Sequence, residues 1–432
     1  MDDTTLAKLA VPGVVSLVAF LSYSSQLLFY GIEPGSLDKQ QSLVFNILVL
    51  CIWVSYARAC ITDPGRVPAD RQSNEAKRKG PATPAQNFIA RQRYCRKCES
   101  VKPPRSHHCR VCGRCIPKMD HHCPWTANCV SHFTFPHFMR FLFYATTAMC
   151  HLEYSLFVRA NIIWRNRNLP SYLGPSLPQL VHLFILLVVN SLTLFLVSII
   201  FLRTAWGLGG NVTTIESWEI ERHAKLLRRA RALGGYLDGP DGVRLRIVRQ
   251  EFPYDIGIWS NIVQGMGTAN LFAWLWPFST GSRTSGLEFE TNGFEDQGTS
   301  WPPPDPDRMP RLERSFDPED AFVHQHAALS PEEEIVAFKN RQQADFQQRA
   351  QHYDIKRRRP FHKRFDQEDE TPLEDDYITD GEEEAYSGEE GWQDSGGNRL
   401  KDYGVDESVE FYDEDNIPIA ELLRRRREGR GG

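Results

Sequence analysis

Residues 95–129 concentrate the side chains of this 432-residue chain that could do chemistry, with seven of its ten cysteines and four of its thirteen histidines. Three pairs of cysteines have a two-residue spacer: Cys95 and Cys98, Cys109 and Cys112, Cys112 and Cys115. Such a spacer allows a tight turn to bring both thiolates onto one tetrahedral zinc ion. The pattern therefore predicts metal binding. A disulfide scaffold would require an oxidising compartment.

The number of potential ligands exceeds what two zinc ions need. Seven cysteines and four histidines give eleven, whereas two four-coordinate ions use eight. A surplus thiol and imidazole within Asp120-His121-His122-Cys123 would supply an activated nucleophile: a thiol, a base beside it and a carboxylate that holds the imidazole tautomer. Spacing alone leaves open which residues are spare.

This stretch resembles the DHHC-type protein S-acyltransferases, also called palmitoyltransferases. The central match runs from Asp120 to Trp125 and continues in Asn128-Cys129-Val130, with the upstream Cys/His series in the same order and spacing. Three outlying motifs also match: Asp63-Pro64-Gly65, Thr213-Thr214-Ile215-Glu216, and an aromatic-and-asparagine motif at Pro253–Asn261. The resemblance covers roughly residues 9–270.

The resemblance implies a role for most of the Cys and His residues in this stretch. It assigns one zinc ion to Cys95, Cys98, His108 and Cys115, and a second to Cys109, Cys112, His122 and Cys129. Cys123 is then the nucleophile that carries the acyl group, His121 the general base, and Asp120 the residue that orients His121. His107 stays unassigned, and the residues that contact coenzyme A are not indicated.

Two positions depart from the family pattern. The family usually has glycine after the sequence Asn-Cys-Val and asparagine three residues later, where this chain has Ser131 and Thr134. Because serine lacks the backbone freedom of glycine, the turn at this point is expected to differ in detail.

Apolar helices are expected to hold this stretch at a membrane. After a short N-terminus (1–8), uncharged or nearly uncharged runs predict four spans at 9–32, 40–57, 138–160 and 180–202. These lengths suit a bilayer core of about 30 Å at about 1.5 Å per helical residue. The second run is short and contains Gln40, Gln41 and Asn46, so a buried soluble helix remains its alternative. The third contains His151 and Glu153.

Basic residues predict the orientation of these spans. Between Arg58 and Lys118 there are fifteen Lys or Arg residues and four acidic ones. Because basic loops stay on the cytoplasmic side, the loop 58–137, the region 203–278 and both termini are expected to be cytosolic. The Asn211-Val212-Thr213 sequon would then carry no glycan.

The C-terminal part has a different composition. Residues 279–432 lose apolar periodicity, and thirteen of the twenty-five residues at Asp366–Glu390 are acidic. Such a segment cannot bury enough apolar surface to fold, and we expect a disordered acidic tail. The net charge of −5 and the mean hydropathy of −0.42 are averages over an apolar N-terminal part and an acidic C-terminal part. These averages therefore exclude no class of partner.

The expected protein is thus an α-helical integral membrane enzyme with four spans, a cytosolic two-zinc Cys-rich domain between spans 2 and 3, and a disordered tail. The resemblance implies ping-pong transfer of palmitate from palmitoyl-CoA, through Cys123, to juxtamembrane cysteines of membrane proteins. Expected partners are the bilayer, fatty acyl-CoA and protein substrates, without nucleic acid. Residues 136–142 resemble the corresponding segment of a fungal branch of the family that is associated with the endoplasmic reticulum membrane. A membrane zinc-finger adaptor and a RING-type ubiquitin ligase are the competing functions.

Overall fold

The computed structural model describes residues 3–68, 94–95, 97–168, 170, 173–238, 244–282, 284–293, 301–303, 305–306, 335–336, 338–339, 342–343 and 394–406. The chain divides into two compact units, Met1–Arg311 with Ser387–Gly432, and Leu312–Tyr386. Within the second unit the described residues are three short helical fragments. The first unit contains the fold and the site. The acidic run 366–390 lies outside the described residues.

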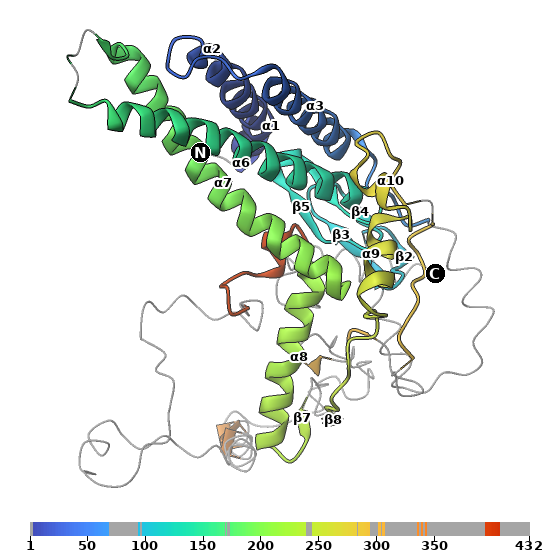
Figure 1. Cartoon of the computed structure of the whole chain (residues 1–432). Coiled ribbons are helices and arrows are strands. Elements are labelled where there is room, and N and C mark those ends of the chain that lie inside the picture. Colours follow the sequence, from blue (N-terminus) through green and yellow to red (C-terminus); the bar gives the residue numbers. More distant parts are fainter. Residues whose placement is uncertain are drawn as a thin grey trace. The chain divides into compact units, whose positions relative to one another are not determined.

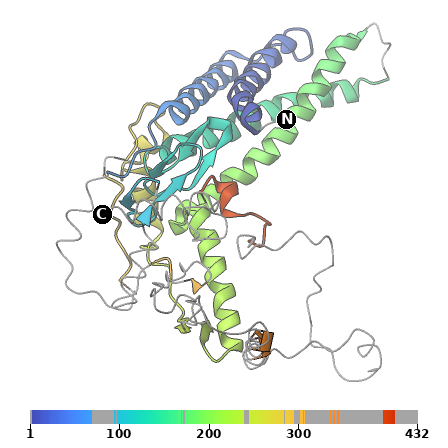
Figure 2. The same ribbon diagram turned by 180° about the vertical axis from the view of Figure 1, so that it is seen from behind.

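Long helices form the larger part of the first unit (Figure 1). A continuous helical segment consists of α1 (Asp3–Ala19), the π-helical η1 (Phe20–Ser24) and α2 (Ser25–Phe29). It is followed by α3 (Lys39–Ile61), α6 (Phe135–Arg165) and α7 (Leu177–Gly210). Helix α6 packs between α3 and α7, as both views show (Figures 1 and 2).

Among the residues that the structure describes, three helical stretches are long and apolar enough to cross a membrane: Leu9–Phe29, Lys39–Ile61 and Leu177–Gly210. They contain most of the expected spans 9–32, 40–57 and 180–202. Helix α6, which contains the expected span 138–160, does not share this composition because it carries Arg140, Glu153 and Arg159. Four spans therefore remain a prediction.

Two charged residues of α6 are hydrogen-bonded to neighbouring helices and loops. Arg140 is buried and donates to the carbonyl oxygens of Trp274 and Ala273. Glu153 accepts hydrogen bonds of 2.7 Å from Asn190 and Ser191 on α7. A helix with polar groups matched in this way can pack among apolar helices although its mean hydropathy is low.

Apolar side chains form the core of the helical part and also cover its outer surface. Phe29, Phe45, Leu156 and Leu186 meet in one buried core. On the outside, Phe184 and other large apolar residues of α7 are exposed, Phe184 by 68%. Such an apolar exterior is costly in water but suits the hydrocarbon region of a bilayer.

Short antiparallel hairpins fill the connection between α3 and α6. They pair β1 (Tyr94–Cys95) with β2 (Ser100–Val101), β3 (His107–Cys109) with β4 (Arg114–Ile116), and β5 (His121–Cys123) with β6 (Asn128–Val130). The turn of the last hairpin contains the 3-10 helix η2 (Pro124–Thr126). Two-stranded hairpins of this length are marginally stable alone, so their Cys and His side chains must contribute to holding them.

Smaller elements follow the helical part. They are α8 (Thr214–Ala232), the hairpin of β7 (Tyr236–Asp238) and β8 (Arg244–Arg246), α9 (Ile258–Met266), α10 (Leu271–Leu275) and the 3-10 helix η8 (Leu400–Tyr403). Helix α8 begins with a capping box, in which the side chains of Thr213 and Glu216 each accept a hydrogen bond from the other residue's backbone N–H.

Two segments of the predicted disordered tail are ordered and packed. Phe289 lies against the guanidinium group of Arg105, and Leu400 and Val405 are buried. The prediction is wrong for these segments because their few apolar side chains pack on distant residues. Leu400 and Val405 join a core with β4 and α8, and Phe289 lies against the rings of His132 and Tyr254, so there is no local periodicity to detect.

Candidate active site

The two metal-ligand sets implied by the family resemblance are brought together in space. Their ligand atoms, one from each of four residues, lie within 4.8 Å of one another in each set. The first set is Cys95, Cys98, His108 and Cys115, and the second is Cys109, Cys112, His122 and Cys129. His107 belongs to neither of these clusters.

The distances within both sets fit a tetrahedral zinc ion. In the first set the three sulfur atoms lie 3.2–3.8 Å from Nδ1 of His108. In the second they lie 3.5–3.6 Å from Nδ1 of His122. Zinc–sulfur and zinc–nitrogen bonds of about 2.3 and 2.0 Å at a tetrahedral angle would place these atoms about 3.5 Å apart.

Strand alternation separates His122 from His121 and Cys123 in β5. His122 pairs with Cys129 across the hairpin, while His121 and Cys123 lie at the positions on either side. Successive side chains of a strand point to opposite faces. His122 therefore faces the second metal-ligand set, and His121 and Cys123 share the other face.

Asp120, His121 and Cys123 form a connected polar group. Asp120 Oδ2 lies 3.2 Å from Nδ1 of His121, and His121 in turn interacts with the Cys123 thiol. Burial alone would lower the pKa of His121, but Asp120 and Cys123 outweigh it and raise this pKa to about 10. Burial alone would raise the pKa of Cys123, but the charge and hydrogen bond of His121 lower it. The site favours a thiolate beside an imidazolium.

The Thr213–Glu216 motif after α7 is hydrogen-bonded to Asp120 of this group. Thr214 donates to Asp120 Oδ1 through its backbone N–H at 2.5 Å and its hydroxyl at 2.9 Å. Two residues further on, Glu216 accepts hydrogen bonds of 2.5 and 2.7 Å from Arg105, and both side chains are almost fully buried. The N-terminus of α8 is thus fixed to the zinc-binding loops at two points.

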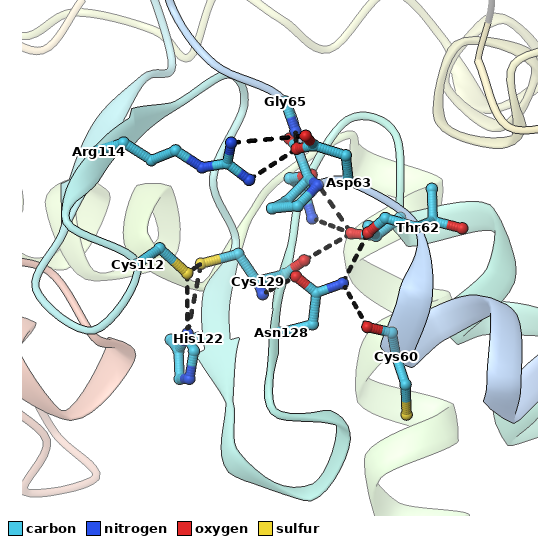
Figure 3. Close-up of polar contacts among 12 residues, drawn as sticks. Cys60, Thr62, Asp63, Gly65, Cys112, Arg114, His122, Asn128 and Cys129 are labelled. Carbon is cyan, nitrogen blue, oxygen red and sulfur yellow. Dashed lines mark hydrogen bonds and ion pairs between the residues drawn. The ribbon is translucent and has the colours of Figure 1, made fainter.

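The motif after α3 and residue Asn128 connect the same hairpins to the helices (Figure 3). Asn128 donates to the carbonyl oxygens of Ala59 and Thr62, at 3.0 and 2.8 Å. Asp63 accepts from Arg114 at 2.7 Å. Together these contacts place the hairpin that carries Cys123 against the end of α3.

The two departures from the family pattern are accommodated by hydroxyl groups. Ser131 donates to the Pro64 carbonyl oxygen at 2.8 Å, and Thr134 donates to the Cys129 carbonyl oxygen at 2.6 Å. The turn therefore does not require glycine at 131.

The aromatic-and-asparagine motif, Pro253–Asn261, is hydrogen-bonded to the end of α7. Asn261 is fully buried and donates to the Gly209 carbonyl oxygen at 2.7 Å. Asn211 at the end of α7 donates to the Tyr254 carbonyl oxygen and accepts from Lys118, both at 2.8 Å. One hydrogen-bond network thus joins the end of α7 to α9 and to the loop that contains Lys118.

A cavity of about 1170 Å³ opens from Cys123 between the helices. Most of its wall is apolar and comes from α1, η1, α3, α6 and α7; Phe138, Leu142, Leu152 and Leu196 are among its residues. Cavities of this kind bind the apolar parts of ligands. A thiol that lines a large, mainly apolar cavity can accept an acyl group whose chain lies between the helices.

Comparison with known proteins agrees with this geometry. The sequence profile of the DHHC palmitoyltransferase family matches residues 89–221. Palmitoyltransferase pfa4 of Aspergillus fumigatus is 54% identical over 429 residues, which cover 98% of each chain. The chain belongs to the DHHC palmitoyltransferase family.

Other fungal members of the DHHC palmitoyltransferase family also match almost the whole chain. Palmitoyltransferase pfa4 of Emericella nidulans is 52% identical over 427 residues, which are 98% of this chain and 97% of its own. Palmitoyltransferase PFA4 of Gibberella zeae is 40% identical over 450 residues, 99% and 97% of the two chains. The protein is therefore a membrane palmitoyltransferase. The adaptor and ubiquitin-ligase alternatives are set aside.

Sequence reasoning missed three contributors to this site. In the sequence Arg105 and Lys118 count only as basic loop residues, although Arg105 is buried against Glu216 and the partly buried Lys118 lies near Asp120. Residues 394–406 were assigned to a disordered tail. The sequence carries no signal for Arg105, because the burial of Glu216, which requires a cation beside it, is visible only in the folded chain.

Proposed function

We propose that this palmitoyltransferase works by a ping-pong reaction through an acyl-enzyme at Cys123. Palmitoyl-CoA is the acyl donor, and cytosolic juxtamembrane cysteines of membrane-bound proteins are the acceptors. The observation that carries the proposal is the position of the Cys123 thiol, which interacts with His121 and lines the large apolar cavity.

In the first half-reaction the Cys123 thiolate attacks the carbonyl carbon of the palmitoyl thioester. The bond from that carbon to the coenzyme A sulfur breaks, and the departing thiolate takes a proton from the His121 imidazolium. Asp120 accepts a hydrogen bond from the imidazole and keeps its tautomer and orientation. The products are S-palmitoyl Cys123, neutral His121 and free coenzyme A.

In the second half-reaction neutral His121 accepts the proton of the substrate cysteine. The substrate thiolate attacks the acyl carbon, and Cys123 leaves as a thiolate beside the regenerated imidazolium. Both thioesters are of similar energy, so the enzyme needs to supply only positioning, a reactive thiolate and exclusion of water.

The two Cys/His sets are proposed to bind structural zinc ions. Each set offers four protein ligands, so a bound ion would have no open position for water or substrate. Zinc in such sites supplies folding energy to the hairpins, and the chain's own residues carry out the acyl transfer.

The proposed topology places four spans in the endoplasmic reticulum membrane, with α6 as the third. The fifteen basic residues between Arg58 and Lys118 support a cytosolic location for the Cys-rich domain and both termini. Membrane-bound substrates would then meet Cys123 at the level of the cytosolic bilayer surface.

A two-step labelling experiment tests the reaction order. The purified protein is incubated with tritiated palmitoyl-CoA, separated from all free donor, and then mixed with a membrane-anchored protein that has one juxtamembrane cysteine. We expect the label to move from enzyme to acceptor without added donor. Transfer that requires donor and acceptor at the same time would contradict a ping-pong mechanism.

A further inference from the structure

The segment Asp394–Asp406, here called the strap, packs directly on the Cys/His hairpins although it follows the last of them, which ends at Val130, by 264 positions (394 − 130). Leu400 and Val405 are 2% and 0% exposed. They join a buried core with Ile116 of β4 and Trp218 of α8. The strap is therefore part of the folded Cys-rich domain.

The strap extends the edge of β3. Val405 forms an antiparallel bridge with Cys109, Gly404 accepts a hydrogen bond of 3.0 Å from the Arg110 N–H, and the Asp406 N–H donates to the His108 carbonyl oxygen at 3.0 Å. His108 and Cys109 belong to different metal-ligand sets. The strap thus binds the backbone at the junction between the two sets.

The strap also contacts the strand that carries the nucleophile. The φ of Gly404 is +80°, and a Cβ atom at this position would lie 2.5 Å from Cβ of His122. Only glycine permits so close an approach. The backbone of the strap therefore rests against the residue that precedes Cys123.

Residues of η8 form part of the wall of the acyl cavity. Asp402 and Tyr403 line the cavity into which Cys123 opens, as do Ser217 and Ile220 of α8. The strap contacts both β5 and α8 here. It closes the cavity between the catalytic hairpin and the helix that holds Asp120.

Polar contacts fix both ends of the strap. Tyr403 donates to Asp394 at 2.9 Å and so closes the strap on itself. The neighbouring Ser395 donates to Glu221 of α8 through its backbone N–H at 2.7 Å. At the other end, Asp406 forms an ion pair of 2.5 Å with Lys97 in the β1–β2 loop.

We propose that the strap is a positioning element of the acyltransferase, which holds β5 against α8 and keeps water from the acyl-enzyme. The proposal rests on the acyl-enzyme at Cys123. When the strap is absent, water enters between β5 and α8 and adds to the thioester carbonyl. The carbon–sulfur bond then breaks, and the products are free palmitate and the Cys123 thiol.

A pair of truncated chains tests this proposal. A chain that ends at Asp406 keeps the strap, whereas one that ends at Gln393 lacks it. Each is loaded with tritiated palmitoyl-CoA, separated from donor, and followed for loss of hydroxylamine-sensitive label. We expect label loss about tenfold faster without the strap, because small displacements and water entry affect thioester lifetime strongly. Equal lifetimes would overturn the proposal. A chain ending at Asp406 that acquires no label would instead contradict the acyl-enzyme itself.

Two glycine substitutions separate the contact with β5 from general effects on folding. Gly404→Ala places a methyl group against His122, whereas Gly397→Ala, with a similar φ of +77°, meets nothing within 4 Å. Both substitutions strain the backbone of the strap, and only the first displaces it from the hairpin. We expect faster hydrolysis of the acyl-enzyme in Gly404→Ala with an unchanged zinc content, and unchanged hydrolysis in Gly397→Ala. If the two variants hydrolyse the thioester equally, the strap does not position β5.

Discussion

Thr214 contacts Asp120 through both its backbone and its hydroxyl, across 94 positions of the sequence: the N–H donates to a carboxylate oxygen at 2.5 Å, and the hydroxyl lies 2.6 Å from the Asp120 carbonyl oxygen and 2.9 Å from the same carboxylate oxygen. Thr214 is the first residue of α8, so the positive end of the helix dipole also faces this carboxylate. In the proposed mechanism Asp120 orients His121, so α8 would act on His121 through this contact although the helix contributes no reacting group. The contact also makes the catalytic group dependent on the junction between α7 and α8.

The Thr214 hydroxyl should therefore matter for catalysis. Thr214→Val keeps the shape of the side chain but leaves one bond to Asp120 unmade, at about 1–3 kcal/mol. We expect acyl-enzyme formation to slow by about tenfold, since about 1.4 kcal/mol corresponds to a factor of ten. The rate of label uptake from tritiated palmitoyl-CoA measures it. Thr147→Val is the matched control, because the Thr147 hydroxyl donates only to the Phe143 carbonyl oxygen in its own helix. Equal rates in the two variants would argue against the role of Thr214.

The buried pair of Arg105 and Glu216 should be the most sensitive ion pair to substitution. Glu216→Gln leaves the guanidinium group buried without a counter-charge, which typically costs about 3–5 kcal/mol. We expect a markedly lower thermal unfolding temperature in detergent. Lys225→Gln is the comparison, because its ion pair with Glu221 is partly exposed at 3.7 Å and is worth less than about 1 kcal/mol. A Glu216→Gln protein as stable as Lys225→Gln would show that the pair does not hold α8 on the loops.

Loss of one metal ligand should remove zinc and activity together. His108→Ala breaks the first set, and zinc binding in such modules contributes on the order of 10 kcal/mol to folding. We expect the zinc content of the purified protein to fall from two ions per chain to one or fewer, with loss of acyl-enzyme. Elemental analysis of zinc measures this. Cys150→Ser changes an exposed cysteine of α6 and should keep both ions. Two retained ions in His108→Ala would remove His108 from the ligand set.

Asn211 should carry no glycan although it begins a sequon. Its side chain is buried and bonds to Arg105, Lys118, Tyr254 and Gln264. A glycan could not be attached without breaking this network, and the expected cytosolic location also excludes it. Glycosidase treatment of protein from a eukaryotic host should leave its mobility unchanged. A glycan mapped to Asn211 by mass spectrometry would contradict both the topology and the packing.

The sequence was most informative where chemistry fixes spacing. A two-residue spacer between cysteines has few structural solutions, and the structure brings together the ligand sets that the resemblance assigns. The apolar runs of α3 and α7 were similarly predictable, because a bilayer demands about 20 apolar residues. The same rule does not identify α6, because charged residues interrupt its apolar sequence. Arg140 and Glu153 are matched by partners on other elements, which no local pattern reveals.

The sequence was least informative where a few residues join a distant core. Leu400 and Val405 stand among polar residues in a tail of acidic composition, and nothing around them indicates a helix or a strand. Their burial depends on β3, β4 and α8. The same holds for Arg105 and Lys118, whose partners follow about one hundred positions later. Long-range partners of this kind can be found only from the folded chain.

The identity of the nucleophile is the central claim, and intact-protein mass measurement tests it most directly. The purified protein and its Cys123→Ser variant are incubated with palmitoyl-CoA, and their masses are compared before and after hydroxylamine treatment. We predict one hydroxylamine-sensitive palmitoyl adduct on the unaltered protein and none on Cys123→Ser, with the same zinc content in both. A hydroxylamine-sensitive adduct that persists in Cys123→Ser would contradict the assignment.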